Sequence, residues 1–248
     1  MANTLAEAVA IVRLAREAGV LLAVNQNARW APPYRATWSL LRQGFLGTVY
    51  HITHLMRNNQ DSRPALQQSW YAREPRFQIL QYTVHYIDLL RFWVGREPRR
   101  VWAQTSRKPG QAFRGEVIAT LVLDFGPELQ AIILDHNASW PECPVTVEFV
   151  VEGTDGQIAG DVQQNRLQVR HRTWPRMVWE PALEGRWFPT AFIGTMGDLL
   201  EAIATGRPPA VSGEDNLKTL AIVEAAYRSA AEGRAVDPAG VLSEALGG

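Results

Sequence analysis

The stretch TLAEAVAIVRLAREAGVLLAV, residues 4–24, decides how the rest of the chain is interpreted. Thr4 and Glu7 form a capping box, in which each side chain accepts a hydrogen bond from the other residue's backbone N–H. Apolar residues at helical spacing follow, Gly19 ends the helix, and residues 20–24 are typical of a short buried strand. Because a helix that leads into a buried strand is half of a parallel βαβ unit, we expect the chain to open partway through such a unit.

The composition indicates a chain with a large core and no charge bias. It has 248 residues, of which 46% are hydrophobic, with 25 basic and 25 acidic side chains. Balanced charge argues against nucleic acid as a partner. No apolar run approaches the ~20 residues of a membrane span, and the first residues lack a signal-peptide pattern. With Cys143 as the single cysteine, we expect a cytoplasmic protein without internal disulfides.

Helices and strands are segregated along the chain. The predicted helices after the opening stretch cover residues 34–42, 79–94, 190–204 and 215–231, and the predicted strands cover residues 48–56, 100–106, 116–125, 129–137, 145–152, 167–172 and 177–180. This pattern predicts an α+β fold, with a large, mostly antiparallel open sheet that carries helices on one face. Residues 57–78 form a long irregular loop of the kind that often carries function.

The sheet is expected to take part in assembly. Residues 117–123 and 131–134 are apolar at successive positions, which is typical of strands buried on both faces. The chain has too few helices to cover both faces of such a sheet. We therefore expect the second face to form an isologous interface in a homodimer or homotetramer.

The order of these motifs resembles that of the Gfo/Idh/MocA oxidoreductases. The matching stretches are residues 4–19, 27–32 (NARWAP), 44–49 (GFLGTV), 84–90 (VHYIDLL), 151–156 (VEGTDG), 206–209 (GRPP), 212–215 (SGED) and 224–230 (EAAYRSA). The resemblance implies that residues 1–26 are a remnant of a dinucleotide-binding Rossmann domain. It also implies that residues 27–248 form the substrate-binding and oligomerisation domain.

Two features of that family do not occur in this sequence. None of the 19 glycines forms the Gly-x-Gly of a pyrophosphate-binding loop. The family's Glu-Lys-Pro motif, whose lysine is the usual catalytic group, would precede the stretch that resembles Met1–Glu7. Lys108 and Lys218 are the only lysines, and we expect both to be surface charges. NAD or NADP, the family's cofactor, is therefore not expected to bind tightly to this chain alone, and a separate nucleotide-binding partner is possible.

The leading site candidate is His85. At helical spacing Gln81, His85 and Asp88 share one face. The resemblance implies that His85 is a proton relay or substrate ligand, and that Gln81 stands where the family often has an aspartate. Glutamine can bond a sugar hydroxyl but cannot take a proton. Asp88 either orients His85 or is a structural partner. The alternative is that His85 is a core histidine with satisfied hydrogen bonds.

The remaining candidates lie nearby in the predicted fold. Arg29 and Trp30 either border the cleft between nicotinamide and substrate or pack at the domain junction. Arg57, Trp70 and Tyr71 are candidate sugar contacts, since an aromatic face stacks well on a pyranose ring. No metal site is expected, because the two histidines of His51-x-x-His54 would point to opposite faces of a strand.

Two functions follow from these observations. The first is the substrate-binding part of a nicotinamide-dependent oxidoreductase that acts on a sugar, polyol or related hydroxy compound, and that is not expected to be active alone. The second is a non-catalytic ligand-binding or assembly subunit derived from the same family. The first accounts for the site positions that remain in the chain. The second accounts for the missing loop and lysine.

Overall fold

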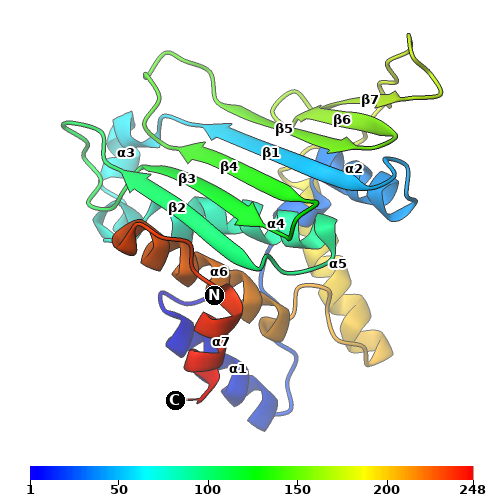
Figure 1. Cartoon of the computed structure of the whole chain (residues 1–248). Helices are drawn as coiled ribbons and strands as arrows, with labels where there is room; N and C mark the ends of the chain where they lie inside the picture. Colours follow the sequence, from blue (N-terminus) through cyan, green and yellow to red (C-terminus); the bar gives the residue numbers. More distant parts are fainter. Residues whose placement is uncertain (248) are drawn as a thin grey trace.

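A seven-stranded sheet organises the computed structural model, which describes residues 1–247 (Figure 1). The strands are β1 (Val49–Arg57), β2 (Arg100–Ser106), β3 (Ile118–Asp124), β4 (Gln130–His136), β5 (Thr146–Gly153), β6 (Gly156–Asp161) and β7 (Arg166–His171). Their order across the sheet is β2-β3-β4-β1-β5-β6-β7. Only the central pair, β1 with β4, is parallel. The expected large, mostly antiparallel open sheet is confirmed.

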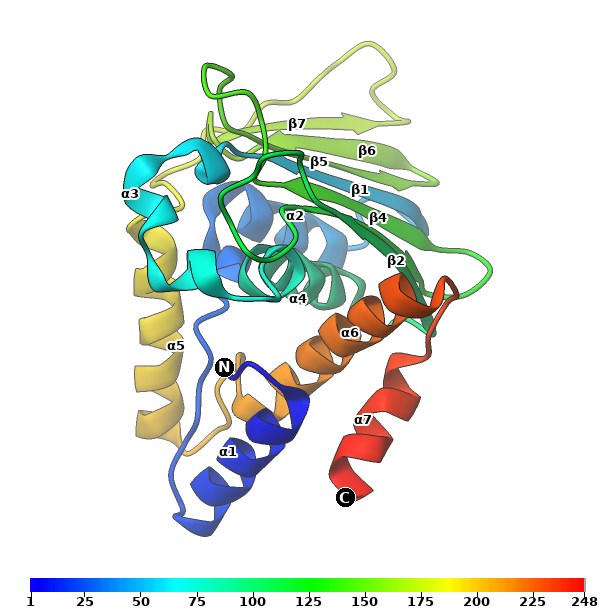
Figure 2. The same cartoon turned by 90° about the vertical axis from the view of Figure 1, so that its left-hand side faces the viewer.

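The main helices gather on one face of this sheet. They are α1 (Leu5–Glu17), α2 (Pro32–Arg42), α3 (Pro64–Gln67), α4 (Val84–Val94), α5 (Thr190–Thr205), α6 (Gly213–Glu232) and α7 (Pro238–Gly247). Figure 2 shows α2, α4 and α6 beneath the sheet, with α1, α5 and α7 extending further from it. The expected α+β class is confirmed. Within residues 1–247, no helix combines the length and apolar character needed to cross a membrane.

Several element boundaries differ from the sequence expectation. Strand β6 was not predicted, because its sequence GQIAGD has weak strand character. It still pairs, since Gly160 leaves room for the Phe149 ring: a Cβ there would lie 2.2 Å from that ring. Helix α7 was also missed. Residues 177–180, expected as a strand, contribute only the bridge between Val169 and Trp179.

Within residues 1–247, no helix covers the second face of the sheet (Figure 2). Alternate side chains of β3 and β4 point to that face, so the two strands are not buried on both faces within this chain, as their apolar runs had suggested. Trp102, Val122 and Ile132 lie side by side in the strand register, and Thr53 of β1 separates them from Val150. Leu134 lies beside this row and is 39% exposed, and Trp102 is 38% exposed. The open face therefore carries a row of apolar side chains across β2, β3 and β4.

The opening helix packs against the C-terminal helices. The capping box between Thr4 and Glu7 is present at the start of α1. The apolar side of α1 is buried and packs on α6 and α7. The segment after it is extended rather than a regular strand, and it pairs with residues 211–213: the Val24 N–H donates to the Val211 carbonyl at 2.8 Å, and the Gly213 N–H donates to the Leu22 carbonyl at 2.8 Å. The chain's own C-terminal elements thus cover one side of α1, whereas Val20 and Leu21, expected in a buried strand, are 59% and 46% exposed.

A buried ionic network joins the N-terminal crossing to α4 and α6. The Arg29 guanidinium, in the turn η1 (Asn27–Trp30), donates to both Asp88 oxygens at 2.6 and 2.7 Å. The same side chain donates to Asp215 of α6 at 2.7 Å. Arg91, one turn beyond Asp88, donates to Asp215 at 3.0 Å and to Thr219 at 2.8 Å. Since the Arg29 and Asp88 side chains are almost fully buried, each needs the other to satisfy its charge.

Replacing Asp88 with asparagine should therefore destabilise the fold strongly. The substitution keeps the shape but leaves the buried Arg29 charge without its main partner, so we expect a loss of about 3 kcal/mol in the free energy of unfolding. Urea denaturation measures this loss. The matched control is Arg100→Gln, which removes an exposed pair with Asp124 and should cost less than about 1 kcal/mol. Equal losses in the two variants would show that the network does not stabilise the fold.

Candidate functional site

Two cavities meet at one wall formed by Gln81 and His85. The first, here called the N-terminal cavity, measures about 580 Å³ and is bounded by the extended segment 22–26, by α1 and by α6. The second, the sheet-side cavity, measures about 390 Å³ and is bounded by β1, β5 and the segment before α5. Gln81 and His85 line both cavities. They lie one helical turn apart, as their spacing predicts.

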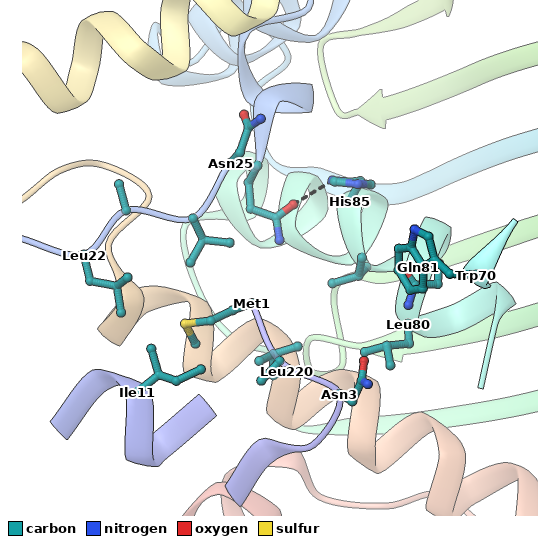
Figure 3. Close-up of a pocket in the computed structure, with 15 residues that line it drawn as sticks. Met1, Asn3, Ile11, Leu22, Asn25, Trp70, Leu80, Gln81, His85 and Leu220 are labelled. Atoms are coloured by element: carbon teal, nitrogen blue, oxygen red, sulfur yellow. Dashed lines mark hydrogen bonds between the residues drawn. The ribbon is translucent and has the colours of Figure 1, made fainter. Parts of the chain in front are cut away.

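The local helix geometry places these side chains. The chain enters the helix through a π-helical turn, η4 (Gln78–Thr83), before α4 begins at Val84. In Figure 3, Gln81 and His85 lie along the same side of the N-terminal cavity, with Leu22 across from them, and Trp70 also lines this cavity. The sequence predicted one continuous helix over residues 79–94. The wider first turn is a local departure of the kind often found at functional sites.

His85 is held as a neutral imidazole with a defined tautomer. Its Nδ1 lies 2.8 Å from the Oε1 of Gln26, so Nδ1 carries the proton and donates to that amide oxygen (Figure 3, dashed line). Burial lowers the pKa of His85 below its ordinary value, and the nearby Asp88 charge offsets this only in part. Within residues 1–247, Nε2 has no hydrogen-bond partner. The ring can therefore accept a hydrogen bond or a proton at Nε2.

The sheet-side cavity is lined by aromatic and amide side chains. Trp187 donates from its indole N–H to the Asn27 side-chain oxygen at 2.6 Å, and its ring stacks on Phe188 at 5.4 Å. Tyr86 stacks on the buried His54, with 3.9 Å between ring centroids. Asn58 and Gln60 add amide groups. Among the described residues that line this cavity, none is Asp, Glu, Lys or Arg. Such a surface suits a neutral ligand with many hydroxyl groups.

Three of the predicted ligand contacts lie outside the sheet-side cavity. Trp70 borders the N-terminal cavity and is 65% exposed. Tyr71 instead packs with Phe77 and Phe113 in a separate aromatic cluster. Arg57 is exposed at the end of β1 and lines neither cavity. The structure thus brings Trp70 together with Gln81 and His85, and it leaves Tyr71 and Arg57 apart from them.

Three further candidates, Asp88, Arg29 and Trp30, have structural partners. Both carboxylate oxygens of Asp88 are taken by Arg29 in the ionic network, and Thr219 also donates to one of them at 3.0 Å. Trp30 packs against α5 at Gly194, where a Cβ would lie 2.2 Å from the indole. Asp88, Arg29 and Trp30 therefore support the wall rather than line it. For each of these three residues the placement favours a packing or ion-pairing role over contact with ligand or with His85.

Sequence reasoning missed several lining residues. Tyr82 and Tyr86 each follow one of the two wall residues directly, so the same i, i+4 spacing could have indicated them. Gln26 and Trp187 had no usable signal, because each comes from an irregular segment that is distant in sequence from His85. Neither lysine lines either cavity: Lys108 is 3.5 Å from Asp61, and Lys218 is 3.8 Å from Glu97. In the part of the chain that the structure describes, no group of three potential metal ligands occurs.

Comparison with known proteins identifies the fold. The profile described as "Oxidoreductase family, C-terminal alpha/beta domain", of the Gfo/Idh/MocA group, matches residues 39–237. The chain belongs to the Gfo/Idh/MocA oxidoreductase family. The resemblance seen in the sequence is thus confirmed. This is a family of NAD(P)-dependent oxidoreductases that act on sugars and polyols.

Individual relatives agree with this assignment. The chain is 31% identical to a D-apiose dehydrogenase of Paraburkholderia graminis, over 98% of this chain and 66% of the relative. It is 26% identical to an inositol 2-dehydrogenase of Rhizobium meliloti, over 92% of this chain and 68% of the relative. An oxidoreductase from Agrobacterium radiobacter, solved with NAD+, L-tartaric acid and magnesium, superposes with a TM-score of 0.81 at 27% identity, over 96% of this chain and 71% of that one. The chain spans about two thirds of the length of these relatives.

The tautomer and pKa of His85 are open to direct measurement. In ¹⁵N-resolved NMR spectra at pH 7, we expect His85 to be neutral with its proton on Nδ1, and to titrate below its ordinary value of 6.5. Gln26→Leu should leave Nδ1 without its acceptor and produce a mixture of tautomers. A ring that is cationic at pH 7, or one whose tautomer does not respond to Gln26→Leu, would contradict the geometry described above.

Proposed function

We propose that this chain is the substrate-binding part of a nicotinamide-dependent oxidoreductase that acts on a neutral sugar or polyol. The observation that carries the proposal is the shared wall of Gln81 and His85. On one side of it lies a cavity of aromatic and amide groups suited to hydroxyl-rich ligands, and on the other lies the N-terminal cavity. A ligand in the sheet-side cavity can present its reacting carbon across this wall.

His85 is proposed as the proton relay of the reaction. With Nδ1–H fixed by Gln26, the Nε2 lone pair can accept the proton of a substrate hydroxyl as the carbonyl forms, or return it in the reverse direction. The Gln81 amide cannot act as a general acid or base, and it would orient a neighbouring hydroxyl by hydrogen bonding. A bound nicotinamide supplies the hydride acceptor or donor. Asp88 and Arg29 would act indirectly, by holding α4 and the 26–30 segment in place.

The cofactor's phosphates have no cradle within this chain. The residues that border the N-terminal cavity, among them Val24, Asn25 and Gln26, could contact a nicotinamide ring, but no Gly-x-Gly loop is present in the sequence. We therefore propose that the nucleotide-binding part is contributed by a further segment or a partner chain. Helix α5 offers a surface on which such a part could pack, because its apolar side chains Ile193, Leu200 and Ile203 are each more than 60% exposed.

The open sheet face is proposed as the homo-oligomer interface. Its row of apolar side chains, Trp102, Val122 and Ile132, crosses β2, β3 and β4, and no helix of the described residues lies above it. A flat apolar face of this kind is stabilised by pairing with a second copy. A homodimer or homotetramer would therefore cover it.

Ligand binding by the isolated chain tests the proposed substrate class. Calorimetric titration with D-apiose and with inositol should detect binding to the wild-type chain. Gln81→Leu and His85→Leu should each weaken it about tenfold, the loss of roughly one hydrogen bond. Arg100→Gln, on the far edge of the sheet, serves as the control and should bind as the wild type does. NAD and NADP alone should bind weakly or not at all.

The outcome separates the two candidate functions. Loss of binding in the two wall variants, with the control unaffected, supports the oxidoreductase part. A folded chain that assembles but binds neither these compounds nor other neutral polyols would favour the non-catalytic assembly subunit. The basis of that alternative is that the sequence has no Gly-x-Gly loop and that neither lysine lines the two cavities.

The assembly has its own test. Leu134→Glu places a charge on the open sheet face without touching the helix-covered side. In analytical ultracentrifugation we expect the wild-type chain to sediment as a dimer or tetramer and the variant to shift toward the monomer. A wild-type chain that remains monomeric at high concentration would exclude this face as the interface.

A further inference from the structure

A buried carboxyl group lies directly behind the turn that carries Gln81. Asp135 of β4 points to the helix-covered side of the sheet and is 1% exposed. Its Oδ2 lies 2.6 Å from the hydroxyl of Thr83, the last residue of η4. The same hydroxyl lies 3.1 Å from the carbonyl oxygen of Gln78, the first residue of η4. The Thr83 hydroxyl therefore joins the two ends of the π-helical turn to the sheet.

The two hydrogen bonds of the Thr83 hydroxyl, to Asp135 and to Gln78, need two hydrogens. Thr83 supplies one of them, and an ionised Asp135 supplies none. A threonine hydroxyl has a single hydrogen, yet Thr83 lies within bonding distance of two oxygens that can only accept if the carboxyl is ionised. Both hydrogen bonds form together if Asp135 is protonated. Its O–H then donates to the Thr83 oxygen, and the Thr83 O–H donates to the Gln78 carbonyl.

We propose that Asp135 is kept as a neutral acid, and that its proton completes a hydrogen-bonded chain through Thr83 to Gln78 that locks the π-helical turn. In this role Asp135 is a positioning residue. The turn contains Gln81 and leads directly into His85. These hydrogen bonds, here called the lock, therefore fix the position of the wall between the two cavities. The consequence for ligand binding rests on the proposed function, whereas the lock itself does not.

The surroundings of Asp135 favour the neutral form. Burial raises the pKa of Asp135 to about 7, although the Thr83 hydrogen bond and the nearby Gln78 amide act in the other direction. The titratable groups that face it are Tyr34 of α2, His54 of β1, and Tyr82 and Tyr86 of the η4–α4 helix. The tyrosine pKa values are raised, and burial lowers the pKa of His54 to about 3, so all four are uncharged near pH 7. Within residues 1–247 no cation contacts this carboxyl group.

The sign of the pH dependence follows from this environment. In the unfolded chain the carboxyl has an ordinary pKa of 3.8, and in the folded chain it has a pKa of about 7. A raised folded-state pKa contributes stability that is fully present below the unfolded value and is lost as pH rises through the folded value. Above pH 7 the proton leaves, and the single Thr83 hydrogen can then reach only one of the two oxygens, Asp135 Oδ2 or the Gln78 carbonyl. One of the two hydrogen bonds is lost, so the chain that joins both ends of the turn to the sheet is interrupted.

The direct test is to titrate the aspartate side-chain carbons of the full chain by ¹³C NMR. We expect one buried carboxyl to titrate near pH 7, and this signal to be absent in Asp135→Asn. The amide signals of Gln81 and His85 should shift with the same midpoint in the wild type. They should not shift there in Asp135→Asn, because the asparagine Nδ2–H donates to Thr83 at every pH as the neutral acid does.

Matched variants exclude indirect explanations. Asp61→Asn changes another buried aspartate, one that accepts from the Ala112 and Phe113 N–H groups and pairs with Lys108, and it should leave the midpoint near pH 7 intact. Thr83→Val should abolish the response of Gln81 while Asp135 still titrates. If every aspartate titrates below pH 5, the neutral acid is excluded. If Asp135 titrates near 7 but Gln81 and His85 do not respond, the positioning role is excluded.

The same series separates this inference from the proposed function. If the chain binds no neutral sugar or polyol, the proposed function fails, and the NMR midpoints still decide whether the lock exists. If it does bind them, wild-type affinity should fall as pH rises through about 7, whereas the affinity of Asp135→Asn should stay constant over that range. A fall of equal size in both proteins would assign the pH effect to another group.

Discussion

The bidentate hydrogen bonds between Arg29 and Asp88 are the interaction on which the site depends. Arg29 belongs to the crossing that follows the opening helix, Asp88 lies in the middle of α4, and Asp215 joins the same cluster from α6. Because both charges are buried, neither side chain can move away without leaving the other unpaired. This fixes the rotation of α4 about its axis, and it also holds Gln26, three residues before Arg29, against His85.

The start of the same helix is held by a second carboxylate. Glu116 accepts from the N–H groups of Phe77 and Ile79 at 3.3 Å each, and from the Tyr227 hydroxyl at 2.6 Å. These contacts satisfy N–H groups that a helix start leaves without partners. Glu116 fixes the start of this helix and Asp88 fixes its middle. The backbone between these two points is therefore held in one position. Gln81 and His85 lie in this segment, so their positions are set before a ligand binds. A binding site requires such preorganisation.

Much of this arrangement was predictable from local sequence signals. The capping box at Thr4, the i, i+4 spacing of Gln81 and His85, and the segregation of helices and strands each depend on neighbours in sequence, and all appear in the structure. Contacts between distant segments were not predictable. The pairing of Arg29 with Asp88 spans 59 residues, and Trp187 reaches the sheet-side cavity from an irregular segment. Strand β6 was missed because its pairing depends on the fit between Gly160 and Phe149, a tertiary contact that overrides weak propensity.

The central claim is that Gln81 and His85 form the wall of a site for a neutral, hydroxyl-rich ligand. A crystal structure of the chain grown with D-apiose or inositol tests it most directly. We expect the ligand in the sheet-side cavity, with one hydroxyl within hydrogen-bond distance of the His85 Nε2 and a second one at the Gln81 amide. A ligand bound elsewhere on the chain, with His85 Nε2 making no contact to it, would contradict the account.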